Sequence, residues 1–343
     1  MHGVKRVKDN EDEGLIDPQV LREKRERLEE YKILNRALLE RNSTKSYSEE
    51  DSIKLSTALL RLNPEHSTAW SFRRKCLNSR ASLIASEEFD KEFLLPELEL
   101  TIRSFEKNPK AYPIWEHRKW VFKQFSKDPD WDSELQLVQR FLKIDGRNFH
   151  AWDYRRHIIS NLKDTKPGNL KKINEEELLF TSKEIESNFS NFSAWHYRSK
   201  LLESEINTQK QQQDKKLEHS MRDGEELIGL ILKKELDWVR TALWIDPNDQ
   251  SAWLYHRWLM SMTESEEIKL NEIGSIEELL KVEPDSKWAL WCLLENRKFT
   301  REEELSKVLD KLLIIDPLRS KRYIDLVENQ SSKLDSSSKK NVL

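Results

Sequence analysis

The sequence predicts an all-α protein, a right-handed superhelical solenoid of α-α hairpin repeats of the tetratricopeptide-like kind. Two observations carry this prediction. Charged residues make up 35% of the 343 residues and there are only 7 glycines, so the many turns of a β sandwich or the phosphate loops of a nucleotide-binding fold are poorly supplied. In addition, one phrase built around tryptophan recurs along the chain, which is typical of a repeat protein.

The repeated phrase occurs five times in the same internal register. An Asn or Asp stands seven residues before the Trp, an aromatic residue or His follows two residues after it, and a basic residue or His follows three after it. The five copies are NPEHSTAWSFRRKCL (63–77), NPKAYPIWEHRKWVF (108–122), DGRNFHAWDYRRHII (145–159), NFSNFSAWHYRSKLL (188–202) and DPNDQSAWLYHRWLM (246–260). Five such matches predict a structural unit that is used repeatedly.

Each phrase follows a segment with apolar residues at helical spacing, such as Leu135, Val138 and Leu142. The unit is therefore two helices joined by a turn, and Asn-Pro or Asp-Pro suits the turn because the residue before proline avoids helical geometry. Segments 283–299 and 316–330 resemble degenerate copies: the first has Trp288 and Trp291 without an Arg in register, and the second has no Trp. We expect about seven helix pairs, with the last ones closing the stack.

A charged leading helix is expected from about Pro18 to Arg41, before the first pair. The domain prediction is a flexible N-terminal segment at 1–17, one helical-repeat domain at 18–330 and a disordered tail at 331–343. The stretch from Ser204 to Gly224, rich in Gln and Lys, is predicted to be a loop insertion.

The Trp and basic residues of the phrase are predicted to be structural. Trp at the start of the second helix offers a large apolar surface to the next unit, and a partly buried Arg three residues later needs helix carbonyls or a carboxylate of the adjacent pair as acceptors. In the fifth phrase His256 stands at the position of the Arg and Arg257 follows it. The predicted structural residues are Trp70, Arg73, Trp115, Arg118, Trp152, Arg155, Trp195, Arg198, Trp253 and Arg257.

Composition argues against several classes of function. The net charge of -3 gives no global attraction to nucleic acid. Cys76 and Cys292 are too few and too far apart for a disulfide framework or a metal motif, and both sit in apolar helical surroundings that predict core thiols. No stretch approaches the ~18 apolar residues of a transmembrane span. We therefore expect a cytoplasmic protein with no metal site of its own.

The phrase Asn/Asp, then Trp, then Tyr-Arg-Arg resembles the repeat of protein prenyltransferase α subunits, over residues 48–330. Within that family the phrases at 108–122 and 145–159, and the opening Met1-His2-Gly3, look most like the Rab geranylgeranyltransferase (type II) members in a compact, fungal-like form. The α subunit shared by farnesyltransferase and geranylgeranyltransferase type I is an alternative. A non-enzymatic helical-repeat scaffold is an alternative of another class, although the tetratricopeptide unit has a more regular spacing of about 34 residues.

The resemblance implies an enzyme that is active only as a heterodimer. A β subunit would hold the zinc ion, and geranylgeranyl would pass from geranylgeranyl diphosphate to C-terminal cysteines of Rab GTPases presented by a Rab escort protein. Carried over by position, Lys110, Tyr112 and His150 of this chain would lie at the active-site rim and stabilise the diphosphate leaving group. His2, at a basic terminus, is a weaker candidate for reversible contact with the zinc of the partner.

Overall fold

The computed structural model describes residues 17–83, 90–213 and 219–328, and all regular structure in these ranges is helical. The predicted all-α class is confirmed. By internal contacts the chain forms two compact units, 1–165 and 166–343, each of which is described by itself. The prediction of one repeat domain at 18–330 stays a prediction, and the predicted terminal segments fall almost wholly outside the described residues.

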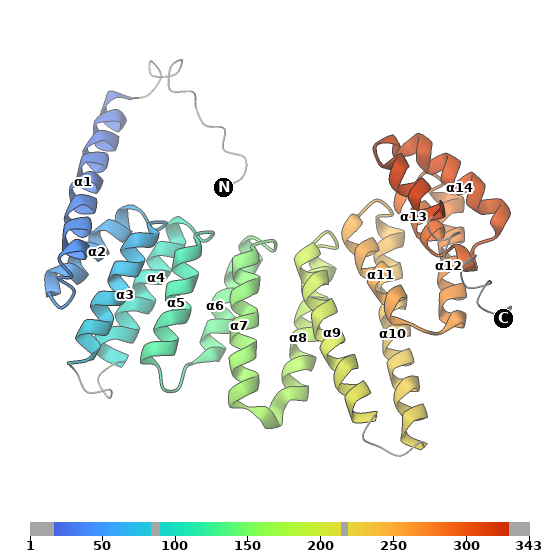
Figure 1. The fold of residues 1–343 in the computed structure, drawn as a ribbon, viewed down its shortest axis with the longest axis horizontal. Helices are drawn as coiled ribbons and strands as arrows, with labels where there is room; N and C mark the ends of the chain where they lie inside the picture. The colour runs from blue at the N-terminus through green and yellow to red at the C-terminus, as the bar shows by residue number, and fades with distance from the viewer. Residues whose placement is uncertain (1–16, 84–89, 214–218, 329–343) are drawn as a thin grey trace, which may run out of the picture. The chain divides into compact units, whose positions relative to one another are not determined.

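The first unit holds a leading helix and three helix pairs (Figure 1). Its helices are α1 (Pro18–Ser43), α2 (Glu50–Leu62), α3 (Ser67–Ala81), α4 (Leu95–Lys107), α5 (Tyr112–Phe125), α6 (Trp131–Ile144) and α7 (Phe149–Thr165), with a π-helical turn, η2 (Asp90–Leu94), before α4. Within each pair, α2 with α3, α4 with α5 and α6 with α7, the two helices pack against each other. The second helices α3, α5 and α7 also contact one another in order, so equivalent positions of successive repeats lie side by side.

The second unit continues the same pattern of pairs (Figure 1). Its helices are α8 (Leu170–Ser187), α9 (Phe192–Gln213), α10 (His219–Ile245), α11 (Gln250–Met262), α12 (Glu266–Val282), α13 (Lys287–Glu295) and α14 (Glu302–Ile315), with short 3-10 turns η3 (Pro167–Asn169), η4 (Arg297–Phe299) and η5 (Pro317–Arg319). Helical residues 320–328 follow η5. With these residues as the partner of α14, the described residues contain the seven predicted pairs.

The predicted loop insertion at 204–224 is wrong for the residues described. Residues 204–213 extend α9, and 219–224 form the first turns of α10; residues 214–218 lie outside the described ranges. The physical reason is composition. Gln, Lys and Glu lose little side-chain entropy in a helix and are good helix formers, so a polar run rich in them lengthens two helices.

The turn inside each of the first five pairs is closed at both ends by side chains. The Asn or Asp of the phrase accepts a hydrogen bond from the backbone N–H two residues later, as in Lys110 N to Asn108 Oδ1 at 3.1 Å. The indole Nε1–H donates to the carbonyl six residues before it, as in Trp115 to Pro109 at 2.9 Å. The same indole bond recurs in the other four phrases at 2.7–2.9 Å, from Trp70, Trp152, Trp195 and Trp253. Trp therefore fixes the turn as well as filling the core.

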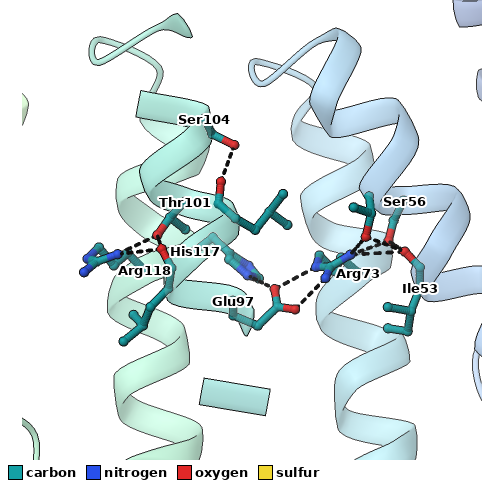
Figure 2. Close-up of polar contacts among 11 residues, drawn as sticks. Ile53, Ser56, Arg73, Glu97, Thr101, Ser104, His117 and Arg118 are labelled. Carbon is teal, nitrogen blue, oxygen red and sulfur yellow. Dashed lines mark hydrogen bonds and ion pairs between the residues drawn. The ribbon is translucent and has the colours of Figure 1, made fainter. Parts of the chain in front are cut away.

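Arg73 joins its own hairpin to the next one (Figure 2). Its Nε and Nη2 donate to both oxygens of Glu97 on α4, at 2.6 and 2.5 Å. Its Nη1 donates to the Ile53 carbonyl and the Ser56 hydroxyl of α2. Arg73 thus uses both kinds of acceptor expected for a buried Arg, a carboxylate of the adjacent pair and a helix carbonyl. Arg118 with Glu134 and Arg198 with Glu235 repeat the arrangement.

The acceptor glutamate has a fixed place in the repeat. The three glutamates that accept from these arginines lie eighteen residues before the Trp of their own hairpin, at Glu97, Glu134 and Glu235, and Glu177 stands at the same offset. Each carboxylate also contacts the residue two after the Trp of its own hairpin, at 2.6–2.9 Å: His117 with Glu97, Tyr154 with Glu134, Tyr197 with Glu177 and Tyr255 with Glu235. In the first repeat this position is Ser52. No Trp phrase precedes this repeat, so no arginine of an earlier hairpin needs an acceptor there.

In the fifth repeat the guanidinium that binds the glutamate comes from another helix. His256, in the Arg register, lies 3.2 Å from Glu272, and Arg240 of α10 also pairs with that carboxylate. Arg257, one position later, is about half exposed and pairs with Glu295 at 2.7 Å. Arg257, which the sequence analysis placed among the repeat residues, is therefore outside the buried link.

The last repeats depart from the phrase in a way the sequence did not reveal. In the sixth, the Ser286 N–H to Glu283 carbonyl bond sets the register and places buried Leu290, not Trp288, at the Trp position. In the seventh, Tyr323 occupies that position and its hydroxyl donates to Asp316 at 2.8 Å. The turn geometry persists after the indole has been lost.

We predict that truncating a linking arginine destabilises the protein severely. Arg118→Ala leaves Glu134 charged, buried and short of donors, so the free energy of unfolding should fall by about 3–5 kcal/mol. Arg103→Ala is the control, because Arg103 pairs with Glu99 on the exposed face of α4 and should cost below ~1 kcal/mol. Urea denaturation measures both. Equal, small losses in the two variants would contradict the assigned role of the link.

A second prediction concerns His117, which stands where three other repeats have Tyr. Burial lowers the pKa of His117 to about 4 from 6.5, although the Glu97 hydrogen bond opposes the shift. As the pH falls, His117 of the unfolded chain binds a proton before His117 of the folded chain does. The contribution of neutral, buried His117 to the free energy of unfolding is therefore fully present above pH 6.5 and is lost as the pH falls toward 4. His117→Tyr should reduce the slope of unfolding free energy against pH by ~1.4 kcal/mol per pH unit between pH 6 and 5. Identical slopes in both proteins would refute this assignment.

Candidate functional site

The three site residues predicted from the sequence come together at the start of two neighbouring second helices. Lys110 lies in the turn before α5, Tyr112 is the first residue of α5, and His150 is the second residue of α7. The Tyr112 and His150 rings meet edge to face, with centroids 4.2 Å apart. All three belong to the first unit, and the ring contact joins the second and third repeats.

The two rings differ in exposure. Tyr112 is 63% exposed, whereas His150 is only 5% exposed. Phe149 lies beside both, with ring centroids 5.6 Å from Tyr112 and 3.9 Å from His150. Tyr112 is thus an exposed phenol that contacts one buried ring, His150, and one exposed ring, Phe149, and a phenol hydroxyl can donate a hydrogen bond to a ligand.

Burial lowers the pKa of His150, and the nearby cations Lys110 and Lys119 act in the same direction. The charge of Asp153 and a hydrogen bond with the Lys110 backbone oppose the shift without cancelling it. His150 is therefore neutral at neutral pH. It contributes a polar ring and holds the Lys110 turn, while the positive charge at this site comes from lysine.

Lys110 is paired in the structure. Its Nζ lies 2.7 Å from Oδ2 of Asp145, the residue that ends α6, with the two side chains 46% and 35% exposed. The hydrogen bond from Lys110 is the main cause of the lowered pKa of Asp145, against a smaller opposing effect of burial. An ion pair this exposed is weak and can exchange partners.

A second lysine lies on the same face and was missed by the sequence analysis. Lys119, one turn after Trp115 on α5, bridges Glu116 at 3.0 Å and Asp153 of α7 at 2.7 Å. Burial alone would lower the pKa of Lys119, but these hydrogen bonds raise it overall. Lys119 could have been singled out by its place four residues after the Trp, because Arg74 and Arg156 are basic residues at the same offset.

The helix that follows Lys110 is unusual at its start. In the first repeat and in the third to sixth, the second helix begins with a side chain that accepts a first-turn N–H; these acceptors are His66, Asn148, Asn191, Asp249 and Ser286. α5 begins after Ala111 with no side-chain cap. The N–H at the equivalent place, that of Ile114, donates to the backbone carbonyl of Ala111 at 3.3 Å, and helix N-termini attract anions.

Four further points bear on the predictions made from the sequence. Among the described residues, no group of three or more His, Cys, Asp or Glu is placed to hold a metal ion. Burial raises the pKa of the Cys76 and Cys292 thiols, to about 11 and about 12, which makes both unreactive. His2 lies outside the described residues, so its contact with a partner's zinc stays a prediction. None of the helices described is long and apolar enough to cross a bilayer.

Comparison with known proteins gives a consistent result at the level of family. The model of the protein prenyltransferase alpha subunit repeat matches residues 49–80, 94–125, 131–162, 174–205 and 232–263. These are the first five helix pairs, and each match contains one Trp phrase.

Three relatives carry the same description, geranylgeranyl transferase type-2 subunit alpha. The protein of Schizosaccharomyces pombe is 33% identical, covering 96% of this chain and 98% of its own length. That of Candida albicans is 31% identical, covering 94% and 96%. The rat protein is 34% identical over 78% of this chain, which corresponds to 43% of the rat sequence.

Among solved structures, the Candida albicans protein geranylgeranyltransferase-I complexed with GGPP superposes with a TM-score of 0.61. The match covers 87% of this chain and 90% of that chain, at 22% sequence identity. At this identity the likeness establishes the shared helical-repeat fold.

Proposed function

Because the chain belongs to the protein prenyltransferase α-subunit family, and within it to the geranylgeranyl transferase type-2 α subunits, we propose that it is one half of a heterodimeric Rab geranylgeranyltransferase. In this proposal a β subunit completes the active site. The enzyme transfers geranylgeranyl from geranylgeranyl diphosphate to C-terminal cysteines of Rab GTPases, which an escort protein presents. The observation that carries the proposal is the convergence of Lys110, Tyr112 and His150 at one helix entrance.

The task assigned to this chain is to receive the diphosphate leaving group. As the bond between carbon and oxygen breaks, negative charge grows on the diphosphate, and donors already aimed at it lower the barrier. Lys110 supplies a full positive charge and Tyr112 an exposed hydroxyl donor. His150 holds these two in place, through its ring contact with Tyr112 and its hydrogen bond to the Lys110 backbone.

The remaining chemistry is assigned to the partner. Because the described residues offer no fitting set of metal ligands, we assign the zinc ion to the β subunit, where it would supply a substrate thiolate. The α chain then contributes binding and charge, and a complete site requires both chains. Geranylgeranyl diphosphate would accordingly bind where the two subunits meet.

The shared α subunit of farnesyltransferase and geranylgeranyltransferase type I is the alternative within the family. The solved type I relative favours it by fold alone, whereas the sequence relatives at 31–34% identity favour type 2. Purified heterodimers separate the two. A type 2 enzyme modifies a Rab protein with paired C-terminal cysteines in the presence of escort protein, and a farnesyl preference for a short cysteine-containing peptide would reassign the chain.

We predict that Lys110→Ala lowers the single-turnover rate of prenyl transfer about 10²-fold, because a charge contact made in the transition state is lost. The matched control is Arg147→Ala, which removes an exposed cation from the equivalent position of the next repeat. That variant should keep a rate close to the parent's. Rates are measured in the α-β heterodimer, with the circular dichroism spectrum and subunit affinity recorded for each variant. A Lys110→Ala rate equal to that of the parent would remove Lys110 from the mechanism.

A further inference from the structure

The partner of Lys110 is a carboxylate with two separate duties. Oδ1 of Asp145 accepts the Arg147 backbone N–H at 3.0 Å and thereby forms the turn of the third repeat. Oδ2 of the same group receives Lys110 Nζ at 2.7 Å. The turn needs one acceptor oxygen, whereas the contact with Lys110 uses the negative charge.

The other repeats show that the turn does not require the charge. The equivalent residues Asn63, Asn108 and Asn188 accept the corresponding N–H through an amide oxygen, at 3.0–3.1 Å. Asp246 forms the same turn in the fifth repeat, at 3.0 Å. An amide at position 145 is therefore compatible with the local backbone, so the turn alone does not explain the negative charge of Asp145.

The contact between Asp145 and Lys110 also has a counterpart one repeat earlier. There the amide of Asn108 donates to the Glu65 carboxylate, which occupies the position equivalent to Lys110. The position five residues before the Trp of one repeat therefore faces the position seven residues before the Trp of the next. The acid occupies the first of these positions in the Glu65–Asn108 contact and the second in the Lys110–Asp145 contact. At the site, this places an acid opposite the one lysine on which the proposed function depends.

We propose that Asp145 is a positioning residue that competes with the diphosphate for Lys110 and so promotes release of the diphosphate product. This inference rests on the proposed function. In the ligand-free state Asp145 keeps the Lys110 side chain oriented; when a diphosphate with several negative charges arrives, it displaces the single carboxylate. Because Asp145 competes for the same ammonium group, the anion binds Lys110 less tightly than it would in the absence of the carboxylate.

Exposure and protonation are consistent with such an exchange. Both side chains are partly exposed, so water stabilises either member while the other changes partner. Lys110 holds the pKa of Asp145 below its ordinary range. Loss of that contact returns the pKa of Asp145 toward the ordinary acidic range of a carboxyl group, so Asp145 stays charged at neutral pH in both states.

The test is Asp145→Asn in the α-β heterodimer, which keeps the turn acceptor and removes the charge. The inhibition constant of inorganic pyrophosphate for prenyl transfer should fall about fivefold at low ionic strength, the size expected for removing one partly exposed charge. Asp246→Asn is the matched control, since it makes the same change in an equivalent turn of the second unit and should leave the inhibition constant unchanged.

Each other outcome overturns the inference. An unchanged inhibition constant in Asp145→Asn would make Asp145 a turn residue only, and an increased constant would mean that it orients Lys110 without competing. In the Lys110→Ala background the effect of Asp145→Asn should disappear; its persistence would show direct repulsion of the anion that does not involve Lys110. The proposed function fails separately, if Lys110→Ala alone changes neither the transfer rate nor pyrophosphate inhibition.

Discussion

Three of the described hairpins are joined to the next one by a buried contact, the bidentate pair between the arginine of one hairpin and the glutamate of the next. Two α-helical hairpins packed only through apolar side chains could slide or rotate with a small change in buried area. The two oxygens of Glu97 fix Arg73 in both distance and direction. Since either charge left alone in the core would be costly, the neighbouring hairpins are held in one register.

The carboxylate of this pair is stabilised from both sides. Burial alone would raise the pKa of Glu97, but the charge of Arg73 and the hydrogen bonds of Arg73 and His117 bring it to about 2. The glutamate is therefore ionised at any physiological pH and receives the guanidinium of one hairpin together with the ring of the next. Because the ring residue follows the Trp by two positions, the same contact also orients the second helix whose first turn carries the site.

Much of this architecture follows from the sequence, and the part that does not has a physical cause. Each phrase holds its Asn or Asp, its Trp and its Arg close together in sequence, so fifteen residues are enough to predict the turn and the helix that follows it. The glutamate lies eighteen residues before its own Trp, but 24, 16 and 37 residues from the arginine it binds. Loop lengths vary between repeats, so only an alignment on the Trp reveals its constant place.

The sequence was less informative about the chemistry of the site than about its location. The resemblance to the prenyltransferase repeat, carried over by position relative to the repeat tryptophans, placed Lys110, Tyr112 and His150 at one site. Their protonation and pairing could not be predicted in this way, because these depend on Asp145 and Asp153 in neighbouring repeats. The same limit explains Arg257: its identity fits the phrase, but a shift of one position on the helix turns it to the exposed face.

The charges at the helix entrance show how the site could bind an anion without being strongly basic. Lys110 is balanced by Asp145, and Lys119 by Glu116 and Asp153. A ligand-free site of balanced, partly exposed pairs avoids the cost of clustered like charges. Under the proposed function, such a site would gain affinity for a diphosphate only by exchanging partners, which would make binding moderate and reversible. The further stabilisation needed in the transition state must then come from groups across the subunit interface, which is a physical reason for an α chain of this kind to require a partner.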